Sequence, residues 1–158
     1  MDITYKTDEG RFNFRVCAVI INDKRILAMH DGRSPYYYLP GGRVKLHETA
    51  EDAILRELKE ELNIEAKIDR PLWLNQNYFL EEVSKEKYHE LCLYFLIDQL
   101  RTKHLSNNDT FEIQEGNKKL IFEWLPFEIL ESQYLYPLFI KKEIFNLPNH
   151  LTIITEYK

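Results

Sequence analysis

The chain has 158 residues, of which 44% are hydrophobic and 30% are charged, a balance typical of one globular domain with a hydrophobic core. Its formal net charge of −5 excludes a general basic surface for holding nucleic acid. No apolar run is long enough to span a bilayer, and no basic stretch followed by an apolar one opens the chain. We therefore expect neither a membrane partner nor a signal peptide.

The first part of the chain predicts a β-hairpin. Residues 11–21 (RFNFRVCAVII) begin with alternating apolar positions and become continuously apolar, as a strand does when it enters a core. Asn22 and Asp23 make a turn, and residues 25–30 are the expected partner strand. A short aromatic strand over residues 36–39 then leads into a Pro-Gly-Gly turn at residues 40–42.

The next segment predicts an amphipathic helix over residues 49–62. Thr49 with Asp52 three positions later resembles a helix-capping pair. Apolar residues then recur at helical spacing. They are Ala50, Ala53, Ile54, Leu58 and Leu62.

The second half of the chain predicts mostly strands. We expect strands over residues 64–68, 73–79, 90–97, 120–125 and 151–157, a loop over 103–118, a helical turn over 126–130 and a helix over 136–145. Cys17 and Cys92 read as buried strand residues without metal-ligand or redox spacing, so a reduced cytoplasmic protein is the expectation. The fold class is mixed α/β.

Acidic residues stand at fixed offsets behind the glycine turn. Glu57, Glu60 and Glu61 share one helix face, where two like charges 4 Å apart repel by about 4 kcal/mol at an effective dielectric near 20. A hard divalent cation such as Mg²⁺ or Mn²⁺ relieves that repulsion, because it prefers oxygen ligands. Judged from the helix alone, these acids could form a solvated acidic face. The glycine turn and Glu48, at their matching offsets, favour a metal site instead.

Residues 42–64 (GRVKLHETAEDAILRELKEELNI) resemble the signature of the Nudix hydrolases, Gly-x5-Glu-x7-Arg-Glu-U-x-Glu-Glu-x-Gly-U, where U is a bulky aliphatic residue. Every charged position is filled. Asn63 replaces the second Gly of the pattern, and Asn is the next best residue for the left-handed conformation that follows a helix. His47 stands where many members of the family have Gly, and we expect it to be a simple loop side chain.

The resemblance implies a single Nudix domain over residues 1–158, with a mixed sheet between helices and a loop-helix-loop signature. It implies that Glu57 and Glu61 are the principal ligands of Mg²⁺ or Mn²⁺, and that Glu60 and the Gly41 carbonyl contribute. It also implies an ion pair between Glu48 and Arg56 that fixes the loop against the helix.

The family reaction is hydrolysis of a phosphoanhydride in a nucleoside diphosphate linked to another moiety. A carboxylate removes the proton of the attacking water, which is typically worth about 10²–10⁴-fold. In some members this base lies in the signature helix, which offers Glu60 and Glu61 here. In others it lies in a loop before the last core strand, where this chain offers Glu112 and Glu115, with Glu115 the better placed.

The sequence leaves the substrate open among ADP-ribose, a nucleotide sugar, a nucleoside triphosphate, a dinucleoside polyphosphate and a coenzyme. Aromatic residues near the expected site could stack on a base, and basic ones could touch phosphate. They are Tyr36, Tyr37, Tyr38, Tyr78 and Phe79, and Arg15, Arg33, Arg43 and Lys45.

Other functions stay open at this point. A Nudix-like sensor that binds a nucleotide without hydrolysing it commonly lacks the charged signature residues, which are intact here. An isopentenyl diphosphate isomerase needs a suitably placed cysteine, and Cys17 and Cys92 fall in predicted strands away from the loop. The acidic balance counts against a long RNA partner. Many relatives form dimers, so a homodimer is also open.

Overall fold

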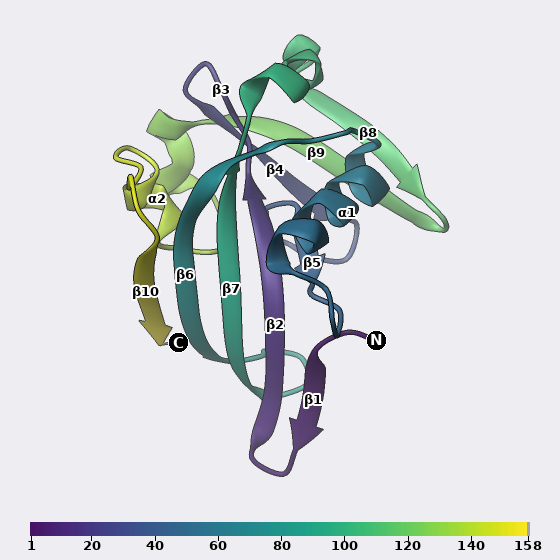
Figure 1. Ribbon diagram of the computed structural model, residues 1–158, viewed down its shortest axis with the longest axis vertical. Coiled ribbons are helices and arrows are strands. Elements are labelled where there is room, and N and C mark those ends of the chain that lie inside the picture. Colours follow the sequence, from purple (N-terminus) through teal and green to yellow (C-terminus); the bar gives the residue numbers. More distant parts are fainter. Residues whose placement is uncertain (158) are drawn as a thin grey trace.

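The computed structural model describes residues 1–157, in which the chain builds two β-sheets. The larger, mixed sheet has the order β1 (Thr4–Thr7), β2 (Gly10–Val19), β7 (Lys87–Ile97), β6 (Ile68–Leu80) and β10 (Thr152–Tyr157), with β5 (Gly41–Arg43) paired to β2. The smaller sheet has the order β3 (Ile21–Asn22), β4 (Arg25–Asp31), β9 (Lys118–Pro126) and β8 (Thr110–Glu115). Figure 1 shows how the two sheets diverge around α1 (Ala50–Leu62).

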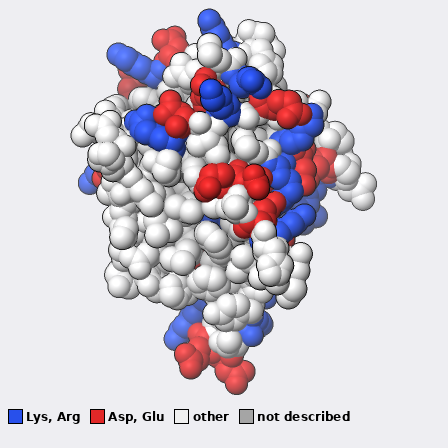
Figure 2. All heavy atoms as spheres, in the orientation of Figure 1, with Lys and Arg blue, Asp and Glu red and all other residues white. Residues whose placement is uncertain are grey.

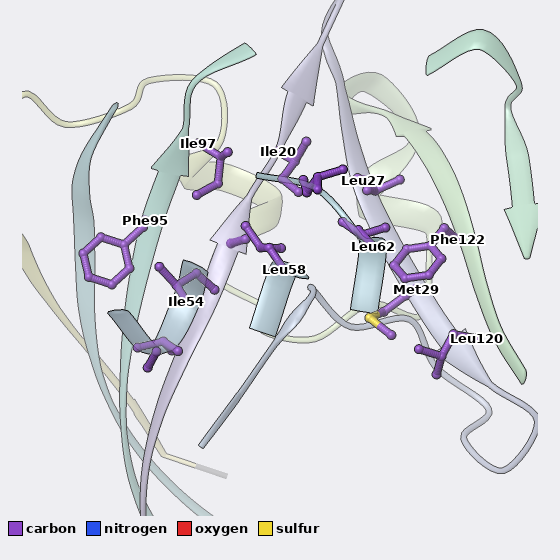
Figure 3. Packing of buried hydrophobic residues seen from close by; sticks show 14 of the residues in the cluster. Ile20, Leu27, Met29, Ile54, Leu58, Leu62, Phe95, Ile97, Leu120 and Phe122 are labelled. Carbon is purple, nitrogen blue, oxygen red and sulfur yellow. The ribbon is translucent and has the colours of Figure 1, made fainter. Parts of the chain in front are cut away.

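The helix α1 covers one face of the larger sheet. Its buried residues Ile54, Leu58 and Leu62 point into a core formed with Phe95 of β7 and Phe122 of β9, as Figure 3 shows. Burying an aliphatic or aromatic side chain of this kind is worth about 1.5–3 kcal/mol. This packing fixes the helix relative to both sheets, and therefore fixes the direction in which its acidic face points.

The opposite face of the larger sheet is covered by the C-terminal part of the chain. Trp73 and Tyr94 from the sheet pack with Ile140 of α2 (Ile140–Glu143) and Leu130 of the 3₁₀ helix η3 (Phe127–Ser132). Two further 3₁₀ helices, η1 (Gln99–Arg101) and η2 (Lys103–Asn107), join the sheets. The sheet thus lies between helices on both faces, and the mixed α/β class is confirmed.

Most of the predicted elements are confirmed, namely the strands within β2, β4, β6, β7, β9 and β10, the signature helix and the turn at η3. Cys17 and Cys92 are buried in strands as expected, and their sulfur atoms lie 3.6 Å apart.

Three predicted elements are wrong. Residues 64–67 form no strand, because Ile64 packs beneath the end of α1 in the helix-side core instead of pairing with a neighbour. Residues 36–39 make only isolated bridges, such as Met29 with Tyr38, since Pro35 and Pro40 have no N–H to donate. The helix expected over 136–145 is a single turn, α2, although the spacing of Ile140 and Ile144 is helical.

Three strands were missed, and one of them is β5, where the sequence predicted only a turn at residues 40–42. The expected loop over 103–118 contains β8, whose Phe111 and Ile113 alternate with polar residues and pack against the helix-side core. The polar composition of the whole segment concealed that alternation. The strand β1 lies at the edge of the larger sheet, where its exposed residues give little hydrophobic signal. Among residues 1–157 no helix is long and apolar enough to cross a membrane.

Candidate active site

The glycine turn lies where a strand and the signature helix come into contact. Gly41 and Gly42 belong to β5, which pairs antiparallel with β2 so that Gly41 is opposite Cys17. A Cβ atom on Gly41 would overlap the carbonyl of Val16, and one on Gly42 would overlap the carboxylate of Glu57. The two glycines are required because they bring the backbone against the acidic side chains of α1.

Both ends of α1 follow the predicted chemistry. The N-cap residue Thr49 accepts a hydrogen bond at Oγ1 from the backbone N–H of Asp52, at 3.0 Å. Asn63 caps the other end with φ 54° and ψ 42°, so the replacement of Gly by Asn preserves the left-handed backbone. His47 also has a positive φ, of 70°, which gives a conformational reason for Gly at this position in relatives.

Arg56 is the centre of an ion-pair network that joins the helix to the loop. Its Nε and Nη2 atoms donate to the two carboxylate oxygens of Glu48, at 2.8 and 3.0 Å. Nη2 also donates to the carbonyl of Arg43, at 3.1 Å, and Nη1 donates to Glu57, at 2.8 Å. The hydrogen bonds from Arg56 lower the pKa of Glu48 to about 2. The predicted ion pair is present, and it is bidentate.

Glu61 is the most buried acid of the signature, at 7% exposure. Its Oε1 accepts a hydrogen bond from the backbone N–H of Gly41, at 3.2 Å. Burial, followed by the charge of Glu57, raises the pKa of Glu61 to about 9. Burial also raises the pKa of Glu57, although the hydrogen bond from Arg56 opposes it. Among residues 1–157, Glu61 therefore faces the glycine turn without an ion-pair partner, while Glu57 shares Arg56 with Glu48.

This donor set fits a divalent cation. Carboxylate oxygens are the ligands that Mg²⁺ and Mn²⁺ prefer, and a raised carboxyl pKa marks a place that lacks positive charge. Among residues 1–157 no group of three acids, histidines or cysteines is already arranged around one point. Glu60 is 48% exposed and lies 3.5 Å from Arg56, so it must turn away from Arg56 to join Glu57 and Glu61.

Glu115 lies at the end of β8, a strand that contacts α1. Its charge contributes to the raised pKa of Glu61, which places the two carboxylates within electrostatic reach of each other. Glu112, the other acid of this segment, forms an ion pair with Lys119 at 3.2 Å. The fold therefore brings Glu115, which the sequence pattern alone put in a loop, towards the signature helix.

The other candidate residues are divided between different parts of the molecule. Tyr36 and Tyr38 contact each other, and Tyr38 lies within electrostatic reach of Glu61. Tyr37 donates a hydrogen bond to Glu123 instead, and Tyr78 stacks with Tyr157. Phe79 stacks on Tyr88 at the far end of β6.

The basic candidates separate in the same way. Arg43 lies 3.9 Å from Asp2, while the backbone N–H of Arg33 donates to the Asp31 carboxylate. Arg15 is half-buried on the sheet beside the glycine turn. The sequence signal for this residue is a charge within the otherwise apolar run of residues 14–21. No sequence signal indicated three other contacts of the site. They are the hydrogen bonds from Arg56 to Glu57 and to the Arg43 carbonyl, and the one from Gly41 to Glu61.

The NUDIX domain family model matches residues 11–143. The chain therefore belongs to the NUDIX family, and the charged residues of its signature are all present, as in a pyrophosphohydrolase. No curated protein matches the sequence.

Solved structures of the same fold are similar over most of their length. The MutT protein from Bacillus halodurans has a TM-score of 0.63 and 15% identity, with coverage of 92% of this chain and 89% of that one. An ADP-ribose pyrophosphatase from Streptococcus suis has a TM-score of 0.53 and 14% identity, covering 91% and 98%. The E. coli ORF135 protein has a TM-score of 0.51 and 24% identity, covering 80% and 81%. At these identities the likeness concerns the fold.

Proposed function

We propose that the protein hydrolyses a phosphoanhydride bond in a nucleoside diphosphate linked to another moiety, in a reaction that depends on Mg²⁺ or Mn²⁺. The observation that carries the proposal is the convergence of Glu57 and Glu61 on the glycine turn. Glu61 accepts a hydrogen bond from the Gly41 N–H at 3.2 Å, and a Cβ atom on Gly42 would overlap the carboxylate of Glu57.

In this proposal Glu57 and Glu61 hold the cation, with Glu60 and the carbonyl of Gly41 as further ligands. When bound, the cation neutralises phosphate charge and lowers the pKa of the attacking water. Arg56 keeps Glu57 in place through its bond at 2.8 Å and ties the loop to the helix through Glu48. The whole chain acts as a single domain.

The proton of the attacking water goes to a carboxylate. Glu115 supports this role because it carries no ion pair among residues 1–157 and its charge reaches Glu61. Glu60 and Glu61 of the helix are the other acids of suitable placement. The substrate belongs to the class of small nucleotide derivatives, which includes ADP-ribose, nucleotide sugars and nucleoside triphosphates.

The substitution Glu61→Gln tests the proposal. Removal of one ligand charge is expected to lower turnover of a nucleotide diphosphate panel with Mg²⁺ by about 10²-fold or more, and to weaken Mn²⁺ binding measured by calorimetry. The urea midpoint should not fall, because the buried acid is replaced by a neutral amide.

The matched control is Glu65→Gln, which removes an exposed acid just beyond the same helix. We expect it to keep full turnover and full Mn²⁺ affinity. Full turnover in Glu61→Gln would contradict the proposed site, and nucleotide binding without hydrolysis in the unmodified protein would favour the sensor alternative.

A further inference from the structure

The sheet face opposite α1 carries a polar patch beside the glycine turn. Six residues from four adjacent strands make up this polar patch, and they are Asn13, Arg15, Glu90, Asn75, Asn77 and Glu156. The strand register aligns them in two rows. Asn13 is opposite Glu90, Glu90 opposite Asn77, and Asn77 opposite Glu156, while Arg15 and Asn75 are both opposite Cys92. The patch therefore runs across the sheet without a break.

Two side-chain amides of the polar patch have unpaired buried atoms. Asn75 and Asn77 are 1% and 8% exposed, and the Oδ1 atom of each has no hydrogen-bond partner within residues 1–157. An unpaired buried polar group costs about 1–3 kcal/mol. The Nδ2 atom of Asn75 donates to Glu156 at 3.0 Å, so that side chain is held in place while its carbonyl oxygen stays unpaired.

Arg15 adds an unpaired cation to the polar patch. It is half-buried in the middle of the sheet, and its guanidinium makes no hydrogen bond or ion pair with the part of the chain that the structure describes. Burial lowers its pKa, but Glu90 together with Cys17, Cys92 and Tyr94 outweighs burial, so the pKa is raised and the side chain is charged. A guanidinium has five N–H donors. Leaving them without acceptors in a partly buried position costs free energy.

The polar patch adjoins the acidic site. In the paired strands Gly41 is opposite Cys17, and Arg15 lies two residues further along β2, which is about 7 Å. Tyr38 lies within electrostatic reach of both the acidic site and the polar patch. Burial, followed by the charges of Asp31 and Glu61, raises its pKa to about 12, and the charge of Arg15 opposes this rise. A group attached to a diphosphate at the glycine turn can therefore reach the polar patch, because the two are separated by only two residues along β2.

The charges of the polar patch decide what kind of group it accepts. Within the polar patch the carboxylates of Glu90 and Glu156 outnumber the guanidinium of Arg15. Arg43, which is opposite Arg15 in the pairing of β5 with β2, adds a cation at the edge nearest the glycine turn. An uncharged ring fits this mixed set of groups, because Arg15 can donate to its acceptors while the carboxylates and the amide oxygens accept from its donors.

The opposite face of the same strands shows that the polar patch is confined to one side. There an aromatic row crosses the sheet at one register, and it consists of Tyr5, Phe12, His89, Tyr78 and Tyr157. Figure 2 shows a broad uncharged area on this side of the molecule, over β10, β6 and β7. At this register the buried amides of Asn75 and Asn77 therefore lie on the face opposite the aromatic row.

We propose that the polar patch is the specificity site for the uncharged polar ring of the substrate, in the first place its nucleobase, and that Arg15 and Asn77 bind that ring directly. The inference rests on the proposed function, whose diphosphate would lie at the glycine turn.

Two variants with matched controls test this inference. Arg15→Met and Asn77→Leu should each raise KM by about tenfold or more, which corresponds to 1.4 kcal/mol, with kcat within about threefold of the unmodified enzyme. Arg11→Met removes an arginine of the same strand that pairs with Glu86 at 2.9 Å, and Gln76→Leu removes the amide between Asn75 and Asn77 on the other face. Both controls should keep KM.

The stability of Asn77→Leu separates a binding role from a structural one. Replacing an unpaired buried amide by an apolar side chain should leave the urea midpoint unchanged or raise it. A raised KM in a protein of equal or greater stability supports the inference. Unchanged KM in both variants, with both folded, would overturn it while leaving the hydrolase function in place.

Binding without turnover distinguishes the two proposals. A nucleoside diphosphate with a methylene group between its phosphorus atoms is titrated into each variant by calorimetry. If the unmodified protein hydrolyses nothing but binds this probe, and Arg15→Met and Asn77→Leu weaken binding about tenfold, the polar patch is supported and the hydrolase function fails.

Substrate analogues identify which ring the polar patch reads, and they do not depend on the folding of any variant. With the unmodified enzyme, an abasic ribose diphosphate ester should have a kcat/KM lower by about 10²-fold than the same ester with its base. If base removal has no effect but removal of sugar hydroxyls from a nucleotide sugar does, the ring is the sugar. Equal rates for all analogues would overturn the inference.

Discussion

Arg56 and Glu48 meet through two parallel N–H···O bonds, of 2.8 and 3.0 Å, that close the loop of residues 43–47 onto the helix α1. The same guanidinium donates to Glu57 on the other side. One arginine thus sets both the loop that carries the glycine turn and the position of an acidic residue of the proposed metal site. Loss of the ion pair between Arg56 and Glu48 should therefore lower both the free energy of unfolding and kcat.

The variant Glu48→Gln tests that double role. It leaves Arg56 with one charged partner fewer at a site where the Glu48 side chain is only 16% exposed, so we expect a loss of about 1–3 kcal/mol in the free energy of unfolding. The measurement is urea denaturation followed by steady-state kinetics, in which kcat should also fall. The exposed pair of Lys59 and Glu65 is the control, and Glu65→Gln should change neither quantity. Equal stability of Glu48→Gln and the unmodified protein would show that the pair is dispensable.

The same pair gives the protein an acid-sensitive stability. The folded-state pKa of Glu48 is about 2, below its ordinary value of 4.5, so its contribution is fully present above pH 4.5 and is lost as the pH falls towards 2. The urea midpoint should therefore fall between pH 5 and pH 3. In Glu48→Gln this part of the pH dependence should be absent, and parallel curves for the two proteins would contradict the assignment.

The sequence predicted the local structure of the signature segment better than it predicted the strands around it. The signature residues carry their own local chemistry, since Thr49 caps the helix and Asn63 ends it through backbone preferences that do not depend on distant contacts. The strand β8 and the packing of Ile64 depend on α1 and on the sheets, which lie far away in the sequence. The polar patch could not be predicted from the sequence either, because it is built from four strands whose order in the sheet differs from their order in the chain.

Gly42→Ala tests the close contact between the glycine turn and α1. The added methyl group would overlap the carboxylate of Glu57, which must then move away from the metal position. We expect kcat with Mg²⁺ to fall by about tenfold or more, as geometric displacement of a catalytic group does. Gly32→Ala is the control, since a Cβ atom there meets nothing within 4 Å, and it should keep full activity. Full activity in Gly42→Ala would mean that Glu57 is not held where the site requires it.

Asn63 tests the one departure from the glycine pattern of the signature. Because Asn63 has a φ of 54°, Asn63→Ala should lower the free energy of unfolding by about 1 kcal/mol, whereas Asn63→Gly should change it by only a few tenths. Thermal and urea unfolding of the two variants give the comparison. If Ala and Gly proved equally stable at this position, the left-handed cap would not be the reason for Asn.

Glu115→Gln tests the origin of the catalytic base. Glu115 lies at the end of β8, and its charge raises the pKa of Glu61, whereas Glu112 on the same strand is paired with Lys119. If Glu115 accepts the proton of the attacking water, kcat should fall by about 10²–10⁴-fold with little change in KM. Glu112→Gln should leave kcat unchanged, which controls for the loss of one acid from this strand. A normal kcat in Glu115→Gln would move the base to the signature helix, where Glu60 is the acid that is free to turn, at 48% exposure.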